Sequence, residues 1–320
     1  MRIAALLAGA LASAAAAAPA PYRAPTLAGT PLEFKTADGW TIHAVWQKAR
    51  DGKPTVILLH GTGQRKEDWR PFARALSRAG DGYAALDLRG HGESRVSPAG
   101  ETLSYRKLRV SARGANDYED MTRDVEAAVA ALIAQGVPEE SLGVMGAEVG
   151  GSVAIKYAAV HPKVPFVIML SPGLDTEEIP IVNAMRAFKG RTTPILLVHS
   201  EADKHSSRDT PLLYAFAKNS VGERNATLIV VPDERGTRML RVNKGLTERI
   251  VDWIANPVQP EAPAVSTAAA PGVSTEAASG VSADTSTASP AEAAPDPSGA
   301  PDSAPQPDPA PAPSGSGDGL

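Results

Sequence analysis

The chain has 320 residues and a formal net charge of −4 at pH 7. It contains no cysteine, which excludes thiol nucleophiles, thiolate metal sites and disulfides, so stability in an oxidising compartment would depend on core packing. Apart from an acidic C-terminal stretch the chain has only a mild excess of positive charge, without a concentrated basic patch in the sequence, and nucleic-acid binding is not expected.

The N-terminus combines one basic residue with a short apolar run. Arg2 precedes an alanine-rich apolar stretch over 3–18, and the small residues 15–17 offer a cleavage site. This pattern is typical of a secretory signal peptide. We assign residues 1–20 to a signal peptide and expect a periplasmic or secreted protein with no integral membrane domain after cleavage. A retained membrane anchor is the alternative, although the run is short for spanning a bilayer.

The segment 21–256 has the length of one sizeable domain, and its elements alternate in chain order. Apolar runs and turn signals predict strands followed by helices, with a hairpin turn at Asp38-Gly39. The expected strands are 32–36, 40–46, 54–60, 83–88, 142–146, 166–170, 195–199 and 227–231, and the expected helices are 69–78, 118–135, 150–160 and 239–255. This order predicts an α/β fold with a mainly parallel sheet, helices on both faces and an antiparallel hairpin at the N-terminal edge.

Two further segments complete the predicted organisation. Residues 96–116 are polar and lack periodicity, and we expect a loop beside the site that is too short to be a separate lid. Residues 257–320 are built mainly from Ala, Pro, Ser, Gly, Thr and acidic residues, with no Lys, Arg or aromatic. Such a composition cannot bury enough apolar surface to fold, which predicts a disordered tail. The tail can serve as a flexible spacer or an interaction segment, or it can be an end without a function.

Four motifs follow predicted strands. They are LHGTG (59–63), DLRGHGES (87–94), GAEVGG (146–151), and the pair HSEAD (199–203) and ERGT (234–237). In this order and spacing the chain resembles the α/β-hydrolase superfamily, and most of all its dienelactone-hydrolase-like and small serine-esterase branch, which has no large cap domain. The resemblance covers roughly residues 30–255.

The resemblance implies where a catalytic site would lie. In the superfamily a sharp strand-to-helix turn carries the nucleophilic serine, and Glu148 holds that position here. Asp203 matches the acid of the triad, whereas Arg235 occupies the position of the catalytic histidine. The backbone amides of Thr62 and Val149 match the two donors of the oxyanion hole.

These replacements do not support Ser-His-Asp catalysis. Arg235 keeps its proton in the working pH range and cannot act as a base, so an ester formed on Glu148 would turn over poorly. His205, two residues past Asp203, is the best substitute base. We expect instead an ion cluster in which Arg235 binds Glu148, while Asp203 holds the same guanidinium from the other side. The alternative is a degenerate site whose side chains point into solvent.

The sequence therefore predicts an exported α/β-hydrolase-fold protein that is a non-catalytic pseudoenzyme, binding a small-molecule ligand or an envelope protein. The alternative function is hydrolysis of ester or similar acyl bonds through a non-standard site. The six histidines are scattered without metal-ligand spacing, and no phosphate-cradling glycine motif ends in Lys-Ser/Thr. Neither a metal nor a cofactor is expected.

Overall fold

The computed structural model describes residues 26–258. The predicted signal peptide (1–20) lies outside the described residues, and so does the predicted tail beyond residue 258. Within 26–258, none of the helices combines the length and the apolar character needed to cross a bilayer.

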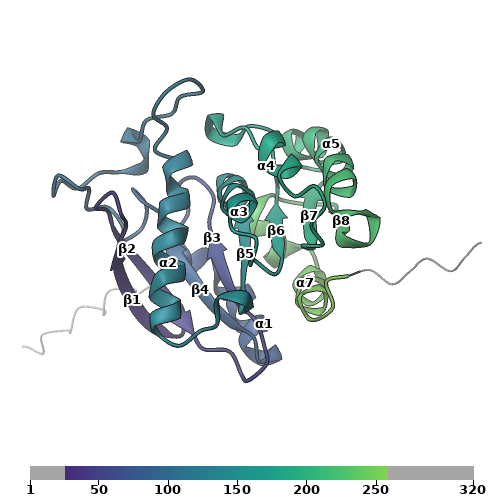
Figure 1. Cartoon of the computed structure of the whole chain (residues 1–320), viewed down its shortest axis with the longest axis horizontal. Helices are drawn as coiled ribbons and strands as arrows, with labels where there is room; N and C mark the ends of the chain where they lie inside the picture. Colours follow the sequence, from purple (N-terminus) through teal and green to yellow (C-terminus); the bar gives the residue numbers. More distant parts are fainter. Residues whose placement is uncertain (1–25, 259–320) are drawn as a thin grey trace, which may run out of the picture. The chain divides into compact units, whose positions relative to one another are not determined.

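An eight-stranded sheet with the order β1-β2-β4-β3-β5-β6-β7-β8 runs through the domain (Figure 1). The strands are β1 (Thr30–Lys35), β2 (Thr41–Gln47), β3 (Thr55–Leu59), β4 (Gly82–Asp87), β5 (Leu142–Ala147), β6 (Val167–Leu170), β7 (Ile195–Ser200) and β8 (Ala226–Val231). Strand β2 is antiparallel to both β1 and β4, and every pairing from β4 to β8 is parallel. The predicted mainly parallel sheet with an antiparallel N-terminal hairpin is thus confirmed.

Burial explains why the strands have different sequence patterns. Every residue of β3, β5 and β6 is buried, as continuous apolar runs require when both faces of a parallel sheet are covered. Strand β2 instead alternates between buried and half-buried residues, because only one of its faces packs on the core.

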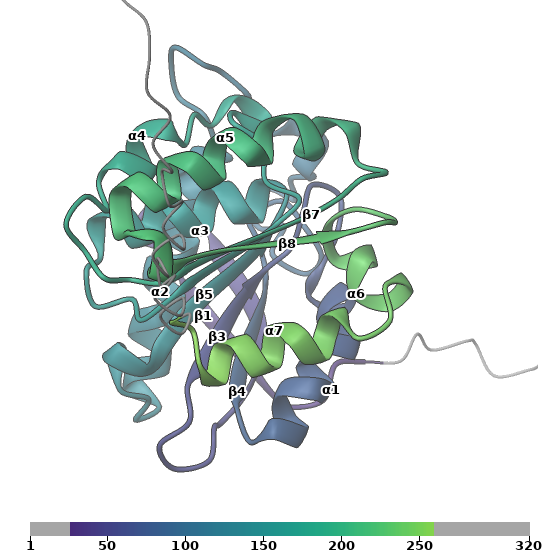
Figure 2. The same cartoon turned by 90° about the vertical axis from the view of Figure 1, so that its right-hand side faces the viewer.

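Helices cover both faces of the sheet (Figure 2). They are α1 (Arg70–Ala79), α2 (Thr122–Ala134), α3 (Val149–Val160), α4 (Val182–Arg186), α5 (Lys204–Val221), α6 (Met239–Val242) and α7 (Leu246–Ala255). One apolar cluster lies under α2, α3 and α5, and a second lies under α1 and α7. The helix predicted over 239–255 is two helices, α6 and α7, because Gly245 takes a left-handed conformation with φ 78° between them.

The segment 96–116 forms the predicted loop, with an isolated bridge between Val96 and Thr102 and one 3₁₀ turn at Tyr105–Lys107. A Cβ added to Gly63 would touch the Tyr105 hydroxyl, so the loop packs beside the turn that follows β3. This region is a loop next to the carboxyl edge of the sheet, where α/β folds place their sites, and it is too small to be a cap domain.

Candidate functional site

A strained turn between β5 and α3 carries Glu148. Its backbone has φ 52° and ψ −119°, a conformation that side chains other than glycine adopt only when the surrounding structure enforces it. A Cβ on Gly146 would collide with the backbone of Gly150, and a Cβ on Gly150 would collide with the Leu59 carbonyl. These glycines let helix α3 start directly against β3, so the chain keeps the sharp turn of a nucleophile elbow with glutamate at its apex.

The Glu148 carboxylate binds Arg235. The two groups form an ion pair in which the Arg235 Nε lies 2.7 Å from Glu148 Oε1, and 12% of the Glu148 side chain is exposed against 65% of the Arg235 side chain. The carboxylate lies between Gly61 and Gly236, since a Cβ on Gly61 would overlap Oε2 and one on Gly236 would press on the carboxyl carbon. Small residues on both sides therefore make room for a side chain longer than serine.

The loop after β8 that carries Arg235 is held by hydroxyl groups at the ends of neighbouring strands. The Gly236 N–H donates to Ser171 Oγ at 2.8 Å, and Ser200 Oγ donates to the Glu234 carbonyl. Ser171 and Glu234 both have positive φ, 49° and 64°. These contacts fix the start of the arginine side chain above the carboxyl ends of β6 and β7.

Asp203 is not part of the ion pair. Its carboxylate accepts from the Ser206 N–H at 3.3 Å, and its own N–H donates to Ser200 Oγ at 3.1 Å. Across residues 26–258, no ion pair joins Asp203 to Arg235. The expected three-membered cluster is therefore wrong in this part: the pair Glu148–Arg235 forms, but Asp203 caps helix α5, where its charge suits the N-terminal end of the helix dipole.

His205 lies on the first turn of α5 and does not bond to Glu148. Its Nε2 is 3.6 Å from Asp209 Oδ2, and its Nδ1 is 3.3 Å from the guanidinium of Arg208. Half of its side chain is exposed. It lines the same cleft as Glu148, but its hydrogen-bond partners are on its own helix.

The two backbone amides predicted to form an oxyanion hole have no recorded acceptor within residues 26–258. Neither the Thr62 N–H nor the Val149 N–H donates to another group of the described chain, and Val149 opens helix α3, where the first N–H groups have no partner within the helix. The Thr62 hydroxyl donates to Glu177 Oε1 at 2.7 Å. Glu177, which none of the sequence motifs marks, therefore lies next to Thr62.

Glu177 comes from a strained loop over the cleft. Glu177 and Glu178 have φ values of 53° and 57°, and the buried Asn116 side chain donates to the Glu177 carbonyl at 2.9 Å. No motif marks this loop, because its position depends on Asn116 and Thr62, which are far from it in the sequence.

Together these groups form a small polar cleft with three acidic residues and one arginine. It encloses about 120 Å³ and is lined by Thr62, Glu148, Ser171, Thr176, Glu177, Asp203, His205 and Arg235. Burial raises the pKa of Glu148, and the charges of Asp203 and Glu177 add to this effect, while Arg235 and Arg238 oppose it. In residues 26–258, no three His, Asp or Glu side chains are placed to hold one metal ion.

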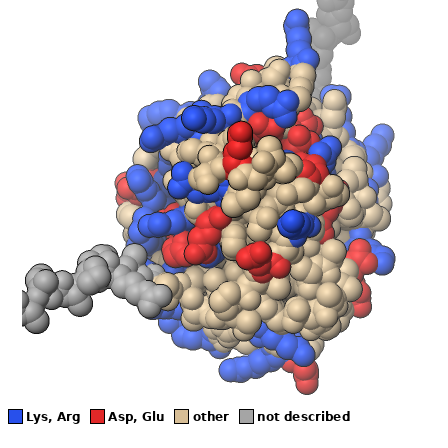
Figure 3. Space-filling view, turned by 90° about the vertical axis from the view of Figure 1, so that its left-hand side faces the viewer, with Lys and Arg blue, Asp and Glu red and all other residues tan. Residues whose placement is uncertain are grey.

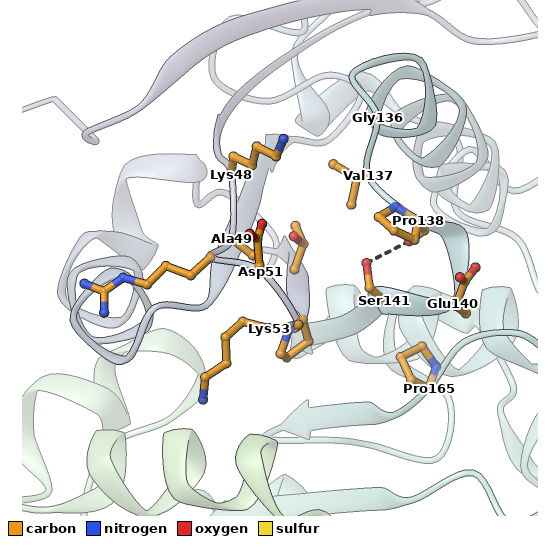
Figure 4. A pocket seen from close by; sticks show the side chains of 14 residues that line it. Lys48, Ala49, Asp51, Lys53, Gly136, Val137, Pro138, Glu140, Ser141 and Pro165 are labelled. Carbon is orange, nitrogen blue, oxygen red and sulfur yellow. Dashed lines mark hydrogen bonds between the residues drawn. The ribbon is translucent and has the colours of Figure 1, made fainter.

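A larger cavity lies away from this site (Figure 4). It encloses about 530 Å³ next to the amino ends of β3 and β5, and its lining includes the segments 48–55 and 136–138. The ammonium groups of Lys48 and Lys53 point in different directions, and the Ser141 hydroxyl is already bonded to the Pro138 carbonyl at 2.7 Å. The lining groups do not converge on one point.

The sheet order, the sharp turn after β5 and the site loops after β7 and β8 define an α/β-hydrolase. Within that superfamily the chain belongs to the serine aminopeptidase S33 family, whose model matches residues 50–232. The superfamily inferred from the sequence motifs is confirmed.

Relatives of known activity are similar over part of their length. Mouse protein phosphatase methylesterase 1 is 32% identical over 131 residues, which cover 41% of this chain and 30% of that protein. A monoacylglycerol lipase of Mycolicibacterium smegmatis is 25% identical over 178 residues, which cover 55% of this chain and 58% of the lipase. The chain thus spans less than two thirds of either relative.

Solved structures show the same fold at low identity. An esterase of Pyrococcus furiosus superposes with a TM-score of 0.56 at 19% identity, covering 72% of this chain and 92% of the esterase. A soluble variant of the Saccharomyces cerevisiae monoglyceride lipase gives a TM-score of 0.52 at 16% identity, covering 76% and 99%. Identity at this level speaks for the fold alone.

Proposed function

We propose that this protein is a non-catalytic member of its family, an exported module that binds a small ligand or an envelope protein. One observation carries the proposal: the Arg235 Nε lies 2.7 Å from Glu148 Oε1, at the two positions where the superfamily has histidine and serine. A nucleophilic mechanism needs a base next to the nucleophile, and a guanidinium cannot accept a proton in the working pH range.

Other groups near the site do not replace the missing machinery. Ser152, one helical turn beyond the elbow, is fully buried and its Oγ has no hydrogen-bond partner in the described chain, so a substrate cannot reach it. His205 contacts Asp209 and Arg208 rather than Glu148. What the cleft retains is suited to binding, because the free amides of Thr62 and Val149 can donate to an oxygen atom of a ligand.

The alternative is a hydrolase of ester or similar acyl bonds, and the electrostatics of Glu148 favour it. A carboxyl group whose pKa is raised by burial and by neighbouring acids is suited to general acid-base chemistry. In that mechanism Glu148 would activate water directly. The contact with Arg235 opposes this role, since it stabilises the unprotonated carboxylate in an ion pair.

Ester hydrolysis by four forms of the chain separates these functions. The natural protein, Glu148→Gln, the double variant Glu148→Ser with Arg235→His, and the control Glu148→Ala with Arg235→His are compared on short activated acyl esters. We expect the natural protein to match buffer and the Ser-His variant to exceed its Ala-His control by about 10²-fold or more, since only the former has a nucleophile that the histidine can activate. Turnover by the natural protein that Glu148→Gln abolishes would establish the hydrolase instead.

Export rests on the N-terminal sequence, a single arginine followed by an alanine-rich apolar run. Intact-mass measurement of the protein recovered from the periplasm or the medium tests it. Loss of a segment ending near residue 20 is expected. A full-length mass in every fraction would contradict cleavage and point to a retained anchor.

A further inference from the structure

In the loop between β4 and α2, hydrogen bonds fix the two ends of an exposed tip. The Asp117 carboxylate accepts from the Arg109 backbone N–H at 2.8 Å and from its guanidinium at 2.6 Å. The Asp117 N–H in turn donates to the Arg109 carbonyl at 3.0 Å. These bonds close residues 110–116 into a tip whose two ends are fixed, and we call residues 105–117 the basic loop.

The outer side of the basic loop holds positive charge without acidic partners. Arg106, Lys107 and Arg113 are exposed, and none of them forms an ion pair with another residue of 26–258. Figure 3 shows Lys and Arg side chains over the upper part of this face, with Asp and Glu side chains between some of them. The expectation that the sequence holds no concentrated basic patch is therefore wrong here, because four basic residues fall within 106–113.

An apolar side chain stands among these cations. Val110 is 47% exposed, and its neighbours in the tip, Ala112 and Ala115, are exposed as well. Aliphatic groups between basic residues at the tip of a fixed loop are suited to an interface that is anionic at its surface and apolar beneath it. A purely ionic partner would bind the cations but gain nothing from Val110.

The inner side of the same loop packs next to the polar cleft. Tyr105 lies against Gly63, beside the amide of Thr62, and Asn116 holds the carbonyl of Glu177. Docking through the outer side would therefore bring the cleft close to the bound surface. This arrangement does not depend on whether the cleft binds or hydrolyses its ligand.

We propose that the basic loop docks this protein onto an anionic phospholipid surface. Arg106, Lys107 and Arg113 would lie at the headgroup level, where each basic residue adds to the attraction. Val110 would enter the boundary between headgroups and acyl chains. The fixed base at Arg109 and Asp117 reduces the conformational entropy that docking must otherwise cost.

Vesicle flotation of the full chain tests the proposal. Vesicles of phosphatidylcholine with phosphatidylglycerol are compared with phosphatidylcholine alone, at low and at 0.5 M salt. We expect binding to the anionic vesicles only, weakened by salt. The triple variant Arg106→Gln, Lys107→Gln, Arg113→Gln should lose about a hundredfold in partition coefficient, and Val110→Ser about tenfold.

Matched controls exclude a general charge effect. Arg74→Gln, Arg78→Gln and Lys244→Gln remove three exposed basic residues outside the basic loop and should leave flotation unchanged. Every variant is recovered with the same N-terminus, so a difference between them reports the loop. Equal binding to both vesicle types, or an equal loss in the control, would overturn the proposal. Retention on heparin together with Val110→Ser floating like the natural protein would do the same, since it would identify a soluble polyanion as the partner.

Discussion

The carboxyl edge of the sheet holds two charged groups built in opposite ways. After β4, Arg89 is 1% exposed and binds Asp124, which is fully buried, at 2.7 Å, and Asp38 at 2.7 Å. After β5, the Glu148 carboxylate has a single ion-pair partner within residues 26–258, Arg235, whose side chain is 65% exposed. The Arg89 group is buried and its guanidinium has several hydrogen-bond acceptors, whereas the Glu148–Arg235 pair has an exposed arginine.

The difference shows which charges the fold requires. Arg89 donates through its backbone N–H, Nε and guanidinium nitrogens to two carboxylates, and it fastens the loop after β4 to helix α2. Removing it would leave a buried carboxylate without a partner. Within residues 26–258 the Arg235 side chain has no ion pair other than that with Glu148, so we expect the fold to tolerate changes at these two residues. Substitutions on the two sides should separate these roles.

The largest effect is expected at the buried ion pair of Arg89 and Asp124. Arg89→Met should lower the free energy of unfolding by about 3–5 kcal/mol, since it strands the buried charge of Asp124. Urea denaturation measures this loss. Arg123→Met is the matched control, because Arg123 also binds Asp38, at 3.2 Å, but is 45% exposed, and it should cost less than about 1 kcal/mol. Equal losses in the two variants would remove the distinction between enclosed and open ion pairs.

A second effect, at the buried His91 close to Arg89 in the sequence, depends on pH. His91 stacks on Tyr105, its Nε2 is buried without a hydrogen-bond partner in residues 26–258, and burial lowers its pKa from 6.5 to about 3. A histidine with a lowered folded pKa contributes its full stability above pH 6.5 and loses it as the pH falls toward 3. At pH 5 the loss should be about 2 kcal/mol relative to pH 7.5.

Comparison with His91→Asn isolates this group. The asparagine amide can still donate to the Arg89 carbonyl, which His91 Nδ1 contacts at 2.9 Å, but it does not titrate. Urea denaturation at both pH values should show a shallower loss in the variant. Parallel curves for the two proteins would mean that His91 takes no part in the acid sensitivity.

Part of this structure could be predicted from the sequence because it depends on local patterns. Strands β3 and β5 were predictable because both faces are buried and the runs are continuously apolar. The elbow was predictable because glycines are required where α3 starts against β3. These features depend on local steric and apolar patterns, which a single sequence displays.

Features set by contacts between distant segments were not predictable. Glu177 reaches the cleft because Thr62 and Asn116 hold its loop, and no local pattern encodes those partners. Helix α5 contains Pro211, a residue that usually interrupts helices, and it was not expected. Asp203 matched the triad acid in sequence, yet the N-terminus of that helix engages its carboxylate.

Breaking the ion pair Glu148–Arg235 should lower the free energy of unfolding by a smaller amount. Arg235→Ala leaves Glu148 mostly buried without its cation, and we expect a loss of about 1 kcal/mol at pH 7. The raised pKa of Glu148 means that the folded state favours the protonated carboxyl, so the loss should shrink as the pH falls toward 5. Thermal and urea unfolding measure it, with the exposed Arg241→Ala as control. Adding Glu148→Gln to Arg235→Ala should restore most of the stability, and a double variant that unfolds more easily than Arg235→Ala would refute this account.

The smallest effect is expected at Asp203 and decides whether the site holds two charges or three. An N-cap bond to Ser206 survives in Asp203→Asn, since asparagine caps helices as well as aspartate, and the change should stay within about 0.5 kcal/mol. Asp203→Ala should cost about 1 kcal/mol by loss of the cap. If Asp203 instead shared the Arg235 guanidinium, Asp203→Asn would be as costly as Arg235→Ala, and the two substitutions together would cost clearly less than their sum. Additive effects of Asp203→Asn and Arg235→Ala therefore support a two-membered ion pair with Asp203 assigned to helix α5.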